Sequence, residues 1–108
     1  MRRGDLVTVA PSGDYGKPRP ALVIQSDFLP ESDSVLVCLL TTTLRETPLS
    51  RLSLPPGEGT GLREPSQVMV DKIMAVRRDR CGAPIGRIDE AVLLAVSRLF
   101  AFVIGIAD

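Results

Sequence analysis

The chain has 108 residues, which suits a single domain spanning residues 1–108, and its 44% hydrophobic and 24% charged residues are typical of a folded protein. Its 13 basic and 13 acidic side chains cancel, so the protein has no net charge to steer nucleic acid, and any such role must depend on a local patch. The absence of histidine excludes Ser-His and Cys-His nucleophilic machinery and histidine-bound zinc, and the two cysteines match no zinc pattern.

Five segments rich in β-branched and apolar residues, separated by loops that contain proline or glycine, are predicted to be strands. In chain order they are residues 5–10, 19–26, 35–43, 51–55 and 67–78. The second segment does not alternate between apolar and polar residues, so both of its faces are expected to be covered. The fifth fits either one long strand or two strands with a bend near Asp71. Residues 79–86, with two glycines and a proline, are expected to form a turn.

A helix is predicted at the C-terminal end, where apolar residues recur at spacings of three and four. The residues with this spacing are Val92, Val96, Leu99 and Val103. Asp89 is the expected N-cap and Gly105 the expected stop, and Phe100 and Phe102 are expected to be buried. Several short strands followed by one helix predict a mainly β fold with a C-terminal α-helix, built on a curved antiparallel sheet or barrel.

The segment "GKPRPALVIQSD", residues 16–27, places Arg19 between two prolines. Each proline fixes its own φ near roughly −65°, and Pro20 also favours an extended backbone at Arg19. The guanidinium is therefore positioned at a reduced entropic cost. A planar cation with five donors suits a phosphate, although an ordinary ion pair with a carboxylate such as Asp71 is an equally simple interpretation.

The third predicted strand ends in three threonines, residues 41–43, which by themselves are common at strand ends. An arginine that opens the second strand and a threonine that closes the third lie at the same end of an antiparallel pair. Arg19 and Thr41 would then offer a cation and a hydroxyl to one phosphate. Asp71 is the best-placed carboxylate to join them, unless it only serves a turn or a salt bridge.

In this order the segments resemble the MazF/PemK-like toxins of bacterial toxin–antitoxin systems. The resemblance covers nearly the whole chain and rests on "MRRGDLVTVA", "KPRPALVIQSD", "SVLVCLLTTT", "SQVMVDKIMAV" and "RCGAPIGRIDEAVLLAVSRLFAFVIGI". It implies a curved SH3-like barrel of the MazF/CcdB type with a C-terminal helix, assembled as a homodimer. It also implies a metal-independent, cofactor-free endoribonuclease that cuts single-stranded RNA at short sequence motifs and is neutralised by a cognate antitoxin protein.

The resemblance also assigns catalytic roles. Arg19 and Thr41 match the catalytic arginine and threonine of the family, and Asp71 falls where some members carry an active-site aspartate. Those members have an arginine two positions earlier, where this chain has Met69, and some use a histidine that this chain lacks. The implied reaction is attack by the RNA 2′-hydroxyl on the neighbouring phosphate, with Arg19 and Thr41 stabilising charge and Asp71 as the candidate base.

Binding an RNA strand requires local positive charge and a surface on which bases stack. Tyr15 is the main candidate for stacking, with a glycine-rich turn as the plainer interpretation. The other candidate RNA-binding residues are Lys17, Thr42, Lys72, Arg77 and Arg78. The arginines also fit the solvated end of a strand.

Two other functions fit the same predicted fold. A CcdB-like toxin binds DNA gyrase through the end of its C-terminal helix, where tryptophan is typical, and this chain has no tryptophan. A non-catalytic small barrel that binds nucleic acid or a peptide would explain the neutral charge and the missing histidine. No run of about 18 apolar residues and no signal-peptide core is present, so a cytoplasmic location without a membrane partner is expected.

Overall fold

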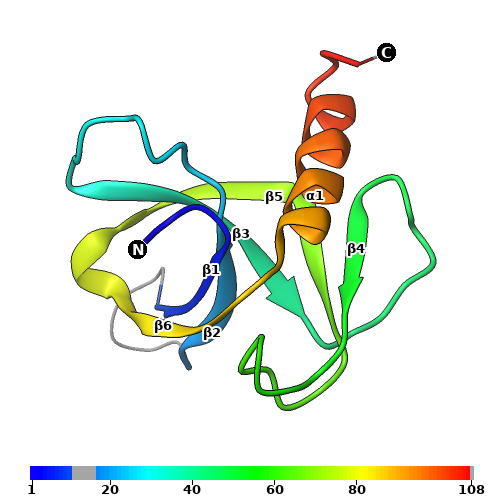
Figure 1. Ribbon diagram of the computed structural model, residues 1–108, viewed down its shortest axis with the longest axis horizontal. Helices are drawn as coiled ribbons and strands as arrows, with labels where there is room; N and C mark the ends of the chain where they lie inside the picture. Colours follow the sequence, from blue (N-terminus) through cyan, green and yellow to red (C-terminus); the bar gives the residue numbers. More distant parts are fainter. Residues whose placement is uncertain (11–16, 108) are drawn as a thin grey trace.

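Six strands form one curved antiparallel sheet, followed by a single α-helix, in the computed structural model, which describes residues 1–10 and 17–107 (Figure 1). The elements are β1 (Asp5–Val9), β2 (Arg19–Val23), β3 (Ser34–Thr41), β4 (Arg51–Leu54), β5 (Ser66–Arg77), a 3-10 turn η1 (Arg78–Arg80), β6 (Cys81–Arg87) and α1 (Glu90–Val103). The hydrogen-bonded order is β4-β5-β3-β2-β1-β6. Within the described residues β4 and β6 do not pair with each other, so the predicted barrel is strongly curved but open.

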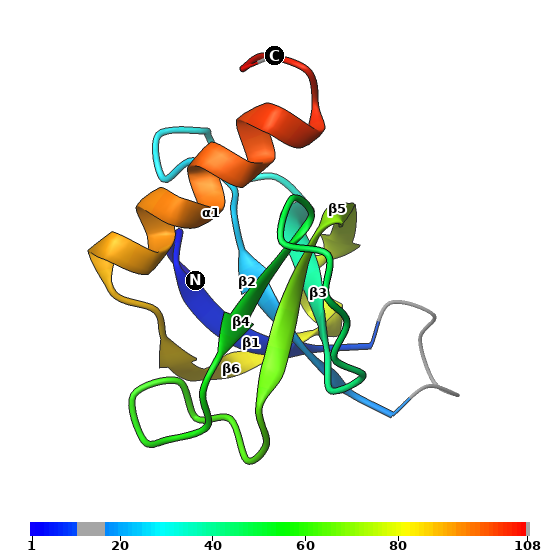
Figure 2. The same ribbon diagram turned by 90° about the vertical axis from the view of Figure 1, so that its right-hand side faces the viewer.

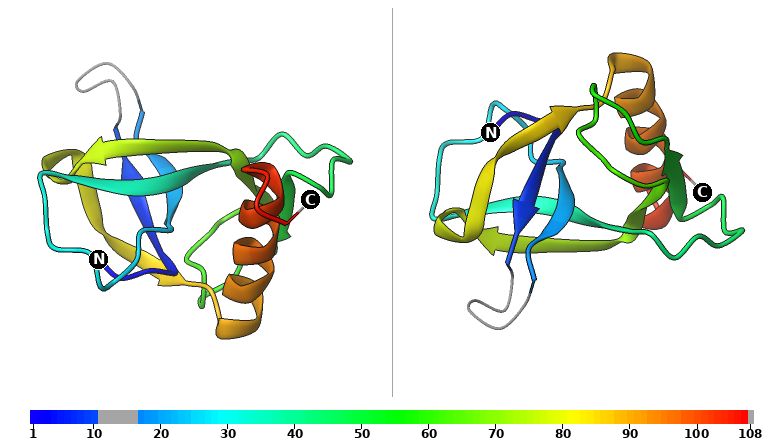
Figure 3. Two further views of the ribbon diagram at one scale, coloured as in Figure 1. Left: turned by 90° about the horizontal axis from the view of Figure 1, so that it is seen from above. Right: turned by 90° about the horizontal axis from the view of Figure 1, so that it is seen from below.

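Apolar side chains are buried on both faces of this sheet. The core inside the curl is formed by Val7, Val9, Ala21, Val23, Val35, Val37 and Val76. The core on the other face, against α1, includes Leu6, Leu22, Cys38, Val68, Val70 and Val96. Figure 3 shows the curled strands on one side of the molecule and α1 beside β4 on the other. The two cores explain why the sequence of β2 does not alternate, since successive residues of that strand enter different cores.

The α-helix begins and ends as predicted. The Asp89 side chain accepts a hydrogen bond from the Val92 backbone N–H at 2.9 Å, which is an N-cap. Gly105 follows the helix at φ 83°, and its N–H donates to the Phe102 carbonyl at 3.0 Å. The Ile106 N–H donates to the Ala101 carbonyl at 2.8 Å, which completes a Schellman motif.

The helix is less buried than its apolar sequence predicts. Only Val96 is fully buried, Phe100 is half-buried and Phe102 is 42% exposed, so the expectation of a buried Phe102 is wrong. One face of the helix packs on the sheet, and several apolar residues of the helix and of the turn after it, including Leu94 and Ile106, are exposed. No helix among residues 1–10 and 17–107 is long and apolar enough to cross a membrane.

The predicted turn at residues 79–86 is wrong, because most of it belongs to strand β6. β6 pairs only with β1 and lies at the sheet edge, where a strand tolerates Pro84. Its glycines are required by close approach: a Cβ on Gly82 would lie 2.5 Å from the Thr8 hydroxyl oxygen, and one on Gly86 2.2 Å from the Thr60 backbone. The glycines that indicated a turn therefore permit tight packing within a strand.

The bend expected near Asp71 is present within one continuous strand, β5. Cys38 of β3 lies opposite Ile73, but Leu40 lies opposite Val68, so the register shifts between them. Residues 69–72 of β5 therefore all face one β3 residue, Leu39, which lies between Cys38 and Leu40. The shift lets the first half of β5 pair with β4 while its second half follows the curl of the sheet.

Candidate functional site

The arginine and threonine predicted to act on one phosphate lie at the same end of neighbouring strands. β2 begins at Arg19, β3 ends at Thr41, and the two strands pair antiparallel with Ala21 opposite Leu39. Extending this register by two residues on each strand sets Arg19 opposite Thr41. Residues directly opposite in an antiparallel pair have Cβ atoms about 5 Å apart and project from the same face. The two side chains therefore flank one small region of the sheet surface.

The Thr41 hydroxyl is held as a hydrogen-bond donor. The Thr43 backbone N–H donates to its Oγ1 at 3.1 Å, which occupies the hydroxyl as an acceptor. The hydroxyl proton remains available for a ligand. Arg19 is exposed at the strand end. The ion pair of Arg19 with Asp71 that the sequence left open is not formed, since the ion pairs in residues 1–10 and 17–107 are Arg77–Asp79 and Arg87–Asp5.

A nearly buried amide, Gln67, extends this surface away from Arg19. Gln67 is only 7% exposed and lies opposite Thr41 on one side and opposite Ser53 of β4 on the other. Its Nε2 donates to the Ser53 Oγ at 3.3 Å, which shows that both side chains lie on one face. Arg19, Thr41, Gln67 and Ser53 thus form a polar row across β2, β3, β5 and β4; Figure 2 shows β4, β5 and β3 side by side.

Gln67 and its neighbours on β4 were not among the site residues predicted from the sequence. A usable signal was present: Leu52 and Leu54 alternate with Arg51 and Ser53, which sets these two polar side chains on the face away from the helix-side core. The partner of that face was not available from the sequence, because it depends on the register between β4 and β5.

Asp71 is exposed in the bend of β5. It follows Gln67 by four positions and belongs to the stretch that faces Leu39 of β3. Its charge also acts on the opposite core: burial, assisted by Asp71 and opposed by Arg3, raises the pKa of the Cys38 thiol to about 12. Arg19 and Thr41 lie at one end of β2 and β3, and no hydrogen bond or ion pair within the described residues joins Asp71 to either of them.

The predicted basic cluster also lies far from Thr41. Arg77 is opposite Ser34 at the start of β3, whereas Thr41 ends this strand of eight residues, so roughly 23 Å of strand separates them. Arg77 forms an ion pair with Asp79 at 2.9 Å, and that contact raises the pKa of the arginine and lowers the pKa of the carboxyl. Arg78 donates through Nε to the Ser32 carbonyl at 2.6 Å.

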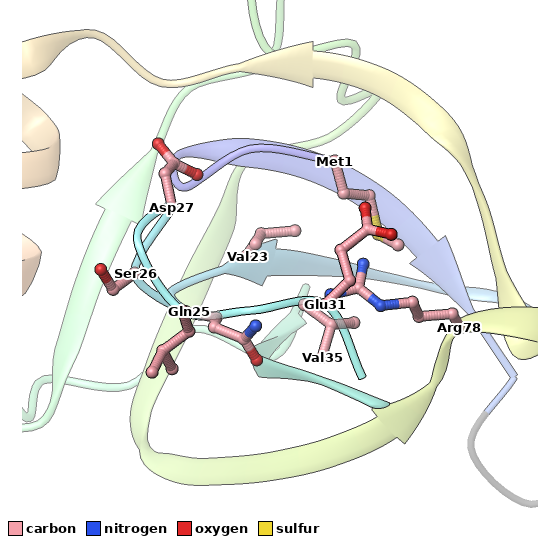
Figure 4. A pocket seen from close by; sticks show the side chains of 9 residues that line it. Met1, Val23, Gln25, Ser26, Asp27, Glu31, Val35 and Arg78 are labelled. Atoms are coloured by element: carbon pink, nitrogen blue, oxygen red, sulfur yellow. The ribbon is translucent and has the colours of Figure 1, made fainter. Parts of the chain in front are cut away.

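Arg78 also lines a small hollow of about 90 Å³ at this far end of the curled strands. In Figure 4 its side chain lies beside Glu31 and Met1, and Asp27 stands farther along the wall. Two carboxylates facing one arginine do not favour a phosphate. This hollow therefore offers nothing to the reaction expected at Arg19 and Thr41.

The remaining candidates divide into those near the polar row and those that are not. Lys17 is exposed two residues before Arg19, and Thr42 lines an open hollow of about 430 Å³ together with Pro18 and Pro20. Lys72 is exposed beside Asp71 in the bend of β5. Tyr15 lies outside the residues that the structure describes. No group of three or more Cys, Asp or Glu side chains in residues 1–10 and 17–107 is arranged to hold a metal ion.

Comparisons with known proteins agree with this architecture. A profile of the family described as PemK-like, MazF-like toxins of type II toxin–antitoxin systems matches residues 2–104. A protein of Mycolicibacterium smegmatis named probable endoribonuclease MazF is 40% identical over 108 residues, covering 99% of each chain. An endoribonuclease in complex with its cognate antitoxin, from a mycobacterial species, superimposes with a TM-score of 0.78 at 22% identity, covering 98% of this chain and 96% of that one. A MazE–MazF structure from Deinococcus radiodurans gives 0.77 at 21% identity, covering 98% and 96%.

Proposed function

The chain belongs to the PemK-like, MazF-like toxins of type II toxin–antitoxin systems, and we propose that it is an endoribonuclease that cuts single-stranded RNA. The observation that carries the chemistry is that β2 begins at Arg19 and β3 ends at Thr41, at the same end of an antiparallel pair whose register, continued past Ala21 and Leu39, sets them opposite. Both side chains present donors, one charged and one neutral, and no carboxylate of the described residues neutralises Arg19. This arrangement suits a phosphate group on which negative charge increases during the reaction.

In the proposed reaction the RNA supplies its own nucleophile. The 2′-hydroxyl oxygen bonds to the adjacent phosphorus, the bond from phosphorus to the 5′ oxygen breaks, and the products are a cyclic phosphate and a free 5′-hydroxyl. The proton leaves the 2′ oxygen for a base, and the 5′ oxygen gains a proton. Arg19 and the Thr41 hydroxyl donate to the non-bridging phosphate oxygens, on which charge develops. Binding on both sides of the phosphate holds the attacking and leaving oxygens in line.

The open hollow lined by Pro18, Pro20 and Thr42 adjoins Arg19 on the other face of the strands. Its prolines form an apolar surface on which a nucleobase of the RNA packs, while Lys17 supplies positive charge close to the same strand end. We assign to this hollow, with Tyr15, which precedes it in the sequence, the binding of nucleobases next to the cleaved linkage. Lys72, Arg77 and Arg78 lie farther away and serve only an RNA long enough to reach them, or one that crosses a dimer.

We expect Asp71→Asn to retain RNA cleavage, with kcat within about threefold of wild type. A general base contributes about 10²- to 10⁴-fold, but no hydrogen bond or ion pair within the described residues joins Asp71 to Arg19 or Thr41. The measurement is single-turnover cleavage across pH, since Asn is nearly isosteric and does not titrate. A loss of 10²-fold or more would instead assign the role of base to Asp71.

The test of the proposed function is incubation of the purified protein with single-stranded RNA in excess EDTA. We expect continued cleavage, with cyclic phosphate on one product and a 5′-hydroxyl on the other, because Arg19 and Thr41 provide the stabilisation in this mechanism. No cleavage of any RNA, combined with binding to DNA gyrase, would favour the CcdB-like function. Binding of RNA without cleavage would favour the non-catalytic barrel.

We further propose that the protein is a homodimer in the cytoplasm, inhibited by a cognate antitoxin. The uncovered apolar side chains of Leu94, Phe102, Ile104 and Ile106, which are 42–76% exposed, supply a surface for association. One structural relative is an endoribonuclease in complex with its cognate antitoxin, and another is a MazE–MazF structure. An acidic and apolar antitoxin segment is suited to compete with RNA for the cations around Arg19.

A further inference from the structure

A second polar pocket continues the row beyond Gln67. It has a volume of about 500 Å³, and we call it the Arg51 pocket. Its walls include Arg45, Glu46, Thr47, Arg51, Ser53 and Gln67. Since Ser53 lies two strands from Thr41, the pocket is about 10 Å from Thr41 on the same face of the sheet. One short stretch of RNA can therefore occupy both places.

The guanidinium of Arg51 is held in position by hydrogen bonds on one side, and the N–H groups on its other side are available to a ligand. Its Nη1 donates to the Thr43 carbonyl at 2.9 Å and to Gln67 Oε1 at 3.2 Å, which uses both hydrogens of that nitrogen. No described residue accepts a hydrogen bond from Nε or Nη2. These two N–H groups form the fork that binds two phosphate oxygens at once. The guanidinium is thus oriented before a ligand arrives, which reduces the entropy lost on binding.

Gln67 also fixes the backbone of the loop that carries Arg45. Its Oε1 accepts from the Arg45 backbone N–H at 3.0 Å, and its Nε2 donates to the Arg45 carbonyl at 3.0 Å. Because Gln67 is nearly buried, these bonds are shielded from water and hold the loop firmly. The Arg45 side chain is exposed and forms no ion pair within the described residues, although Glu46 is on the same wall.

We propose that the Arg51 pocket binds a phosphate of the RNA strand close to the one that is cleaved. Arg51 provides the bidentate contact and Arg45 a second cation, while Gln67 positions both. This inference rests on the proposed function, because its ligand is the same strand of RNA. The pocket acts on binding and alignment of the strand, and Arg19 and Thr41 act on the phosphate that reacts. Glu46 is then expected to weaken phosphate binding.

The deciding variants are Arg51→Lys and Arg45→Ala, with Arg2→Ala, whose side chain is exposed near the N-terminus, as a matched control. Binding is measured with a short single-stranded RNA of mixed sequence, methylated at its 2′-hydroxyls to prevent cleavage, and kcat and KM with the same RNA unmodified. We expect Arg51→Lys and Arg45→Ala each to raise Kd and KM about tenfold, the effect of one charged hydrogen bond, with kcat within twofold. Arg45→Ala should also reduce the magnitude of the negative slope of the logarithm of the RNA-binding constant against the logarithm of the salt concentration by about 0.7.

The outcomes separate this pocket from the proposed function. If wild type cleaves RNA and both variants bind and cleave as it does, the pocket is overturned and the endoribonuclease stands. A fall in kcat with unchanged KM and Kd also overturns a binding role. If wild type cleaves nothing, the proposed function fails, and the binding data alone decide the pocket. Arg45 projects from an exposed loop, so its variant is expected to fold, and thermal melting of each variant checks this.

Discussion

Arg19→Ala is expected to lower kcat for RNA cleavage by roughly 10²- to 10³-fold, the usual effect of removing one preorganised donor from a developing oxyanion. The loss falls on kcat because the guanidinium gains most from the charge that accumulates on phosphorus in the transition state. Single-turnover cleavage of a short RNA measures it directly. A variant that cuts within threefold of wild type would remove Arg19 from the mechanism and with it the main support for this site.

The fold should survive this substitution. Arg19 is exposed and forms no ion pair within the described residues, while Pro20 and the pairing of β1 with β2 still shape the strand end. We therefore expect the free energy of unfolding to change by less than about 0.5 kcal/mol. Arg19→Lys is the graded control: it keeps the charge but loses the planar fork, so its kcat should lie between wild type and Arg19→Ala. Equal activity of the two variants would contradict the geometric role.

The placement of Arg19 and Thr41 at one end of neighbouring strands was predictable because each part depends on local chemistry. Two prolines fix the backbone around one residue, a change from apolar residues to threonines marks the end of the other strand, and antiparallel neighbours bring a start and an end together. None of these steps requires a long-range register. The helix caps at Asp89 and Gly105 were predictable for the same reason.

The features that were not predicted from the sequence depend on the register between strands that are distant in the chain. Gln67 reaches Thr41, Ser53 and the β3–β4 loop only through two separate registers of β5. The register shift in β5 sets Asp71 among the residues that face Leu39, and its size could not be read from a sequence that fitted either one long strand or two strands with a bend. β6 was missed because glycine and proline indicate a turn and a tightly packed edge strand equally well.

Thr41→Val is expected to lower kcat by about 10- to 100-fold, since it removes one neutral donor from the charged phosphate. Valine keeps the β-branched shape that suits the end of β3, so the strand should persist. The Thr43 N–H loses its acceptor but is at the surface, where water replaces it. Thr41→Ser, which retains the hydroxyl, should recover most of the rate, and failure of this rescue would indicate a structural role.

Thr43→Val is the matched control, because the structure uses the backbone of Thr43 and not its hydroxyl. We expect its kcat to stay within about twofold of wild type. Combining Arg19→Ala with Thr41→Val should cost less than the sum of the two losses in activation free energy, since both groups donate to one phosphate and act as a unit. Measured in a double-mutant cycle of single-turnover rates, strictly additive losses would mean that the two side chains act on different parts of the RNA, and the shared phosphate site would have to be abandoned.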